Sequence, residues 1–232
     1  WKFVIVGLIG GLLAGIFGIG GGILMVPALI TLTHLNQRQA AATSLAAIIP
    51  AAFIGSLFYA AVGNVEWLAA GVLAIGGALG AQIGTYLMSR IPQTGLVVGF
   101  AAFQVLIIIS LWTFIPTRGQ AIDWTPWTFA LLALVGLVTG MVSGLVGIGG
   151  GIIVVPALIV LFGASDLVAK GTSLFMIIPS SISGTIANQR RGYLNVRAAA
   201  ITGVVAAAVS PLGGLCANLM TPFVSNVLLA SL

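Results

Sequence analysis

Charged side chains are scarce in this chain of 232 residues. It carries eight Lys or Arg and three Asp or Glu, so that 5% of its residues are charged, whereas 60% are hydrophobic. A soluble domain carries about a quarter charged residues. There are too few polar side chains here to cover a globule in water, so lipid must surround most of the surface. The composition excludes a soluble protein.

Reactive side chains are also few. The chain has one His, one Cys, and no Asp or Glu inside its long apolar segments. This argues against an enzyme, and we expect no catalytic residue, metal ion or cofactor. The lone Cys216 cannot form an intrachain disulfide. The basic residues are scattered singly or in pairs, which suits loops that face anionic lipid and not a nucleic-acid-binding surface.

What the chain has instead is a series of eight apolar segments. They run Phe3–Thr33, Gln39–Val62, Trp67–Ser89, Gly95–Ile115, Trp127–Phe162, Val168–Gln189, Ala198–Met220 and Phe223–Leu232. A membrane-spanning helix needs roughly 20 apolar residues. Five segments fit one crossing each, the first and fifth are too long for one straight helix, and the last is too short. We therefore expect an all-α polytopic membrane protein whose last helix is incomplete.

The two halves of the chain repeat one another. A shift of 129 residues aligns Gly7–Gly84 with Gly136–Gly213 without a gap, and 29 of the 78 positions are identical. Ordered Gly, Pro and Thr-Ser matches are not chance similarity between apolar segments, so the chain contains an internal duplication. We divide it into a first repeat at 1–116, a linker at 117–126 and a second repeat at 127–232.

Each overlong segment contains a glycine cluster, at Gly18–Gly22 and at Gly147–Gly151. Four glycines in five residues cost a helix interior about 1 kcal/mol each, so we expect both helices to break there. Neither cluster has the Gly-Lys-Ser/Thr of a P-loop, and Ile23 and Ile152 stand where a dinucleotide fingerprint needs glycine. Glycines every four residues before each cluster, from Gly7 to Gly15 and from Gly136 to Gly144, indicate close helix packing.

Broken backbone at membrane depth survives only where it is buried in protein or lines a cavity. Paired, glycine-interrupted segments in two repeats are typical of a transporter's binding site, and N–H groups that open a half-helix favour an anion. Close packing through small residues is the alternative explanation of the clusters.

The charges bear on whether each long segment crosses the membrane or turns back at its glycines. If each segment turns back, six basic residues face one side of the membrane and two face the other. If each segment crosses, the division is five and three. The first arrangement follows the positive-inside rule better and makes the two repeats inverted.

Polar residues inside apolar segments complete the candidate site. Thr-Ser pairs open the second helix of each copy, where they could cap that helix or contact a ligand. Further along this helix the two copies differ, since the second has polar residues where the first has mostly apolar ones. Polar side chains in one copy alone suggest where the otherwise symmetric protein selects its substrate. Arg191 could equally be a lipid-facing anchor. The candidate substrate-binding residues are Gly18, Gly20, Gly21, Gly22, Thr43, Ser44, Gly147, Gly149, Gly150, Gly151, Thr172, Ser173, Ser180, Ser181, Asn188 and Arg191.

The motif G-x-G-G-G-x-x-x-x-P-x-L occurs twice, as GIGGGILMVPAL at Gly18–Leu29 and GIGGGIIVVPAL at Gly147–Leu158, each followed by T-S-L. This pattern resembles the TauE/SafE family, the sulfite exporters or 4-toluene sulfonate uptake permeases. The resemblance implies a multi-pass carrier in a bacterial inner membrane for sulfite or small organosulfonates, in either direction. An anion channel with the same glycine-lined site is the alternative.

Overall fold

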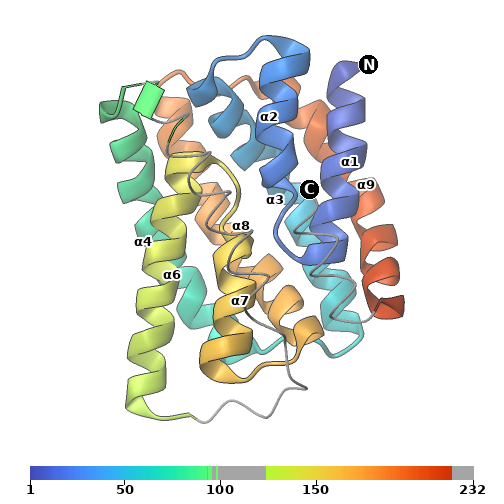
Figure 1. The fold of residues 1–232 in the computed structure, drawn as a ribbon, viewed down its shortest axis with the longest axis vertical. Helices are drawn as coiled ribbons and strands as arrows, with labels where there is room; N and C mark the ends of the chain where they lie inside the picture. The colour runs from blue at the N-terminus through green and yellow to red at the C-terminus, as the bar shows by residue number, and fades with distance from the viewer. Residues whose placement is uncertain (93, 96–97, 99–123, 221–232) are drawn as a thin grey trace.

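The computed structural model describes residues 1–92, 94–95, 98 and 124–220, and within these residues it is all helical (Figure 1). The helices are α1 (Lys2–Phe17), α2 (Gly22–Thr33), α3 (Gln37–Ala61), α4 (Trp67–Arg90), α6 (Pro126–Val146), α7 (Gly151–Phe162), α8 (Asp166–Arg190) and α9 (Val196–Leu219). Five of them are long and apolar enough to cross a membrane. The expected all-α class is confirmed. The segment Phe223–Leu232, most of Gly95–Ile115 and most of the linker lie outside the described residues.

Both predicted helix breaks are confirmed. α1 ends at Phe17, and Gly18 takes the left-handed conformation with φ 68°, which lets the chain leave the helix. α2 begins at Gly22, directly after Gly21 with φ 72°. The second copy repeats this geometry, since Gly147 and Gly150 have φ 82° and 84°. Left-handed backbone is costly for residues that carry a Cβ, which explains the clustered glycines.

At each break the chain folds back on itself. The Cα of Gly21 faces the backbone of Gly10, and a Cβ on Gly150 would lie 2.6 Å from the Thr139 Cγ2. In Figure 1, α1 descends from the N-terminus and α2 returns beside it, whereas α6 and α7 form a similar hairpin from the opposite end of the bundle. α2 and α7 have twelve residues each, about 18 Å of helix, which is too short to cross a hydrocarbon core of about 30 Å.

The helices follow the duplication. The bounds of α2, α3 and α4 coincide with those of α7, α8 and α9 after the same shift of 129 residues. The packing is paired in the same way, because α4 lies along α6 as α9 lies along α1, and α3 packs against α8 at the centre. The structure is therefore two similar helical units around one central helix pair.

The glycine stripes hold the outer helices close together. A Cβ on Gly15 would meet the carbonyl oxygen of Ser210 in α9, and a Cβ on Gly140 would meet that of Gly77 in α4. Gly11 and Gly144 make similar contacts. The packing interpretation of both stripes is confirmed, since small residues let two helix backbones approach without lipid between them.

The outward faces of the helices are apolar, as a lipid-exposed surface requires. Ile75 on α4, Leu134 on α6 and Val204 on α9 are 69%, 56% and 67% exposed. Exposed apolar surface of this extent is rare on a soluble monomer. Together with the five candidate spans, it places the helical bundle in a bilayer.

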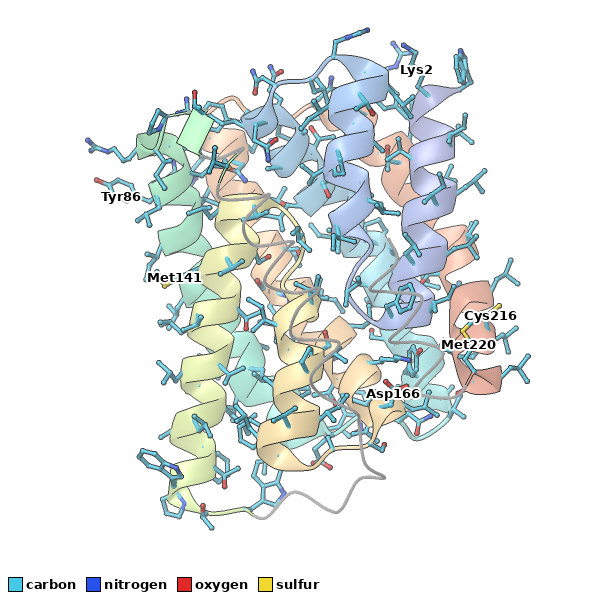
Figure 2. The ribbon with its side chains drawn as sticks, viewed as in Figure 1. Lys2, Tyr86, Met141, Asp166, Cys216 and Met220 are labelled. Carbon is cyan, nitrogen blue, oxygen red and sulfur yellow. The ribbon has the colours of Figure 1, made fainter. Side chains whose placement is uncertain are left out.

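The two ends of the bundle differ in charge. At one end, Arg38 at the start of α3 donates to the carbonyl oxygen of Ile91 at 2.7 Å and lies 5.8 Å from the Tyr193 ring centroid. At the other, the N–H of Glu66 donates to the Thr172 hydroxyl. Figure 2 shows Lys2 at the first end and Asp166 toward the second. Basic residues thus gather at the end where α1 begins.

Candidate glycine-lined anion site

The two glycine turns meet at the centre of the bundle. A Cβ on Gly22 would lie 2.5 Å from the Ile148 Cα, and one on Gly151 would lie 2.5 Å from the Ile19 Cα. Ile48 and Ile177, near the middle of the 25-residue helices α3 and α8, each face both Gly20 and Gly149. The turns therefore lie at mid-height, between the two central helices.

Several backbone N–H groups at these turns donate no hydrogen bond among the described residues. The N–H groups of Gly18 and Gly147 bond back to Ala14 and Ser143 at 3.0 and 2.8 Å. None of the hydrogen bonds found among the described residues is donated by the N–H groups of Gly20–Gly22 or Gly149–Gly151, and all six glycines are buried. Because α2 and α7 begin here, these donors also lie at the positive ends of two helix dipoles. Such a place favours an anion.

Two serines flank the turns, and they differ. The Ser173 hydroxyl donates to the carbonyl oxygen of Gly18 at 2.9 Å. Its counterpart Ser44 lies on α3 between Ala41, which faces Gly147, and Ile48, which faces Gly149. The Ser44 hydroxyl is fully buried and has no partner among the described residues. Ser44 therefore offers a free donor beside the second turn.

The two threonines of the Thr-Ser pairs have a structural role. The Thr43 oxygen accepts from the N–H of Asn195 at 3.3 Å, and the Thr172 oxygen accepts from that of Glu66 at 3.0 Å. Of the two roles that the sequence left open for them, capping of their own helices is excluded, because Asn36 caps α3 and Ser165 caps α8. Each instead bonds the backbone where α9 or α4 begins.

The polar residues gained by the second copy follow α8 away from the centre. Ser180, Ser181 and Asn188 are fully buried, and their side-chain polar atoms have no partner among the described residues. Arg191, at the end of α8, donates to the carbonyl oxygen of Ala187 at 3.3 Å. It lies ten residues beyond Ser181, about 15 Å along the helix. The structure thus groups the glycines with Ser44 and Ser173, and separates Arg191 from them.

Sequence reasoning missed Lys170. Its side chain is 2% exposed and forms a 2.7 Å ion pair with Asp166. A Cβ on Gly18 would lie 2.6 Å from the Lys170 Cα, so this lysine packs against the first turn. Its counterpart in the first copy is Ala41. An Asp and a Lys four residues apart at the start of an apolar helix were the available signal.

Comparison with known proteins supports a transporter. The family model described as sulfite exporter TauE/SafE matches residues 1–111 and 131–232. This chain belongs to that family. Relatives named probable membrane transporter proteins include YunE of Bacillus subtilis (strain 168), which is 32% identical over 83% of this chain and 79% of its own length. A relative in Xylella fastidiosa (strain Temecula1 / ATCC 700964) is 29% identical over 82% of this chain and 73% of its own. No solved structure matches the chain. The protein is thus a multi-pass membrane transporter of the TauE/SafE family.

Proposed function

We propose that this TauE/SafE protein is a secondary carrier for small sulfur oxyanions, such as sulfite or short organosulfonates, in a bacterial inner membrane. The observation that carries the proposal is the set of buried N–H groups at two facing glycine turns that donate no hydrogen bond to the part of the chain that the structure describes. They present partial positive charge without a mobile cation that would trap the ligand. The hydroxyl of Ser44 adds a donor beside them.

The expected affinity suits a carrier. A hydrogen bond to a charged group contributes about 1.5–3 kcal/mol, so a few such contacts give about 4–8 kcal/mol, which corresponds to millimolar to micromolar binding. An oxyanion with three acceptor oxygens can use donors from both turns at once. Binding of this strength also permits release on the other side.

Transport by the purified protein in proteoliposomes, measured with a panel of sulfite, sulfate, thiosulfate and short sulfonates, would test this function. Saturable uptake that is accelerated by the same anion on the opposite side is the expected result for at least one sulfur oxyanion. Flux that neither saturates nor exchanges indicates an anion channel. Absence of both binding and flux for every anion in the panel would refute the proposed substrate class.

A pair of matched variants tests the site itself. Ser44→Ala removes a buried hydroxyl that has no partner among the described residues, so the free energy of unfolding should stay unchanged or rise by up to about 1 kcal/mol. The same change should weaken sulfite binding about tenfold or more if that hydroxyl contacts the ligand. Ser173→Ala is the control for the stability measurement alone, because it loses the bond to Gly18 and should cost about 1 kcal/mol of stability.

Normal sulfite binding by Ser44→Ala would remove this residue from the site. Serine variants are a cleaner test than valine at Gly21 or Gly150. Both glycines have positive φ, and a Cβ at either position meets the preceding helix. Valine there would therefore perturb the fold as well as the site.

The topology is part of the proposal. We propose that the two repeats, 1–116 and 127–232, have inverted orientations and that each glycine turn is the tip of a re-entrant hairpin. The end that carries Arg38 would then be cytoplasmic, in keeping with the positive-inside rule. In a Cys216→Ser background, cysteines beside Arg38 and Glu66 should react with an impermeant thiol reagent from opposite faces of oriented vesicles. Reaction of both from one face would overturn this topology.

A further inference from the structure

The second copy contains a column of buried polar side chains that the central site does not use. The column comprises Thr139 and Ser143 on α6 with Ser180, Ser181 and Asn188 on α8. All five are fully buried, and none of their side-chain oxygens or amide nitrogens has a partner among the described residues. Buried polar groups in a membrane protein are costly unless water or a ligand satisfies them.

Contacts with α4 bring the two helices of the column together. A Cβ on Gly77 would lie 3.3 Å from the Ser180 Cβ, and Gly77 also faces Gly140, the neighbour of Thr139. One turn further, Ala81 and Thr85 face both Gly144 of α6 and Gly184 of α8.

The column also connects the central turn with one end of the bundle. At its inner end, a Cβ on Gly150 would lie 2.6 Å from the Thr139 side chain and 3.4 Å from that of Ser143. At its outer end, Asn188 lies in the last turn of α8, which ends at Arg190. The polar groups thus extend from the second glycine turn to the arginine-bearing end.

The same positions in the first copy are apolar or filled. Gly10 and Ala14 replace Thr139 and Ser143, and Ala51 and Ala52 replace the two serines. The Met25 side chain covers Gly10, where the second copy has Val154 instead of methionine. Tyr59 stands in place of Asn188, is fully buried and donates to the carbonyl oxygen of Gly15 at 2.8 Å.

We propose that this column is a one-sided, hydrated entry path for the anion, from the arginine-bearing end to the central turns between α4, α6 and α8. The corresponding route through the first copy is closed by Met25 and Tyr59. Neutral hydroxyl and amide donors suit a small hydrated oxyanion, because they replace its water without holding it as a cation would. The proposal rests on the proposed carrier function, but the path is testable without a substrate.

The test uses symmetry-matched cysteines in a Cys216→Ser background, reconstituted in oriented vesicles. Ser181→Cys and Ala52→Cys occupy equivalent positions in the two copies, and both native residues are fully buried. Because the repeats are inverted in the proposed topology, Ser181 lies toward the arginine-bearing end and Ala52 toward the Glu66 end. An impermeant methanethiosulfonate is therefore applied to Ser181→Cys from the arginine-bearing end and to Ala52→Cys from the Glu66 end. We expect Ser181→Cys to react at least about tenfold faster than Ala52→Cys, because thiol reactivity follows access to water. Ser180→Cys and Ala51→Cys are a second pair if one variant does not fold.

A plug variant provides the second measurement. Asn188→Tyr introduces into the second copy a tyrosine like Tyr59, which fills the equivalent position of the first copy. It should therefore slow modification of Ser181→Cys about tenfold. Equal rates for the matched cysteines, or no effect of the tyrosine, would overturn the path. Because no anion is needed, a faster Ser181→Cys rate supports the path even if every sulfur anion fails in the transport panel, which would refute the proposed substrate class alone.

Discussion

Replacement of Gly140 by valine is expected to prevent the protein from folding stably. A Cβ at this position would overlap the carbonyl oxygen of Gly77, so α4 and α6 would have to move apart along their whole contact. In lipid, close van der Waals packing is a main force that holds two helices together. We expect a loss of at least about 3 kcal/mol, at the upper end of overpacking effects. Unfolding in detergent, followed by size-exclusion chromatography, measures it.

Gly71→Ala is the matched control for this prediction. Gly71 also lies in α4, but a Cβ there would meet nothing within 4 Å. Alanine should therefore stabilise the helix by about 0.5–1 kcal/mol, because glycine is the poorer helix former. If Gly140→Val and Gly71→Ala proved equally stable, the two helices would not approach each other at Gly140.

Replacement of Lys170 by methionine is expected to have a similarly large effect. The lysine is 2% exposed and its partner Asp166 is 10% exposed, so the change leaves a carboxylate buried without its cation. Removing one partner of a buried pair costs about 3–5 kcal/mol. The free energy of unfolding of Lys170→Met, compared with that of the wild type, measures this cost.

The double variant Lys170→Met with Asp166→Asn should recover much of the loss, because no buried charge is then left alone. Arg197→Met is the control, since this arginine is exposed in the first turn of α9 and its loss should change stability by less than about 0.5 kcal/mol. A Lys170→Met variant as stable as Arg197→Met would show that the ion pair does not contribute to the fold.

The main features of the fold were predictable because they are local or repeated. Glycine clusters break helices wherever they occur, and a shift of 129 residues relates the bounds of α2, α3 and α4 to those of α7, α8 and α9. The packing stripes were predictable for the same reason, since their spacing follows one face of a helix.

Contacts between distant segments were not predictable. Thr43 bonds the backbone of Asn195, which is 152 residues away, so no local pattern distinguishes it from a helix cap. The same holds for the buried polar column in the second copy. No sequence pattern distinguishes Thr139 and Ser143 within α6. The fold shows that they face Gly150, and that α4 packs against both α6 and the Ser180 side of α8.

The reciprocal contact at the centre limits how the transporter can move. Ile19 of the first turn rests on Gly151 of the second, and Ile148 rests on Gly22. Because each tip is packed against the backbone of the other, a shift of one hairpin should displace the other. In the proposed carrier, we therefore expect opening toward one side of the membrane to be a joint movement of both hairpins, so that a crosslink that immobilises one tip should arrest the other.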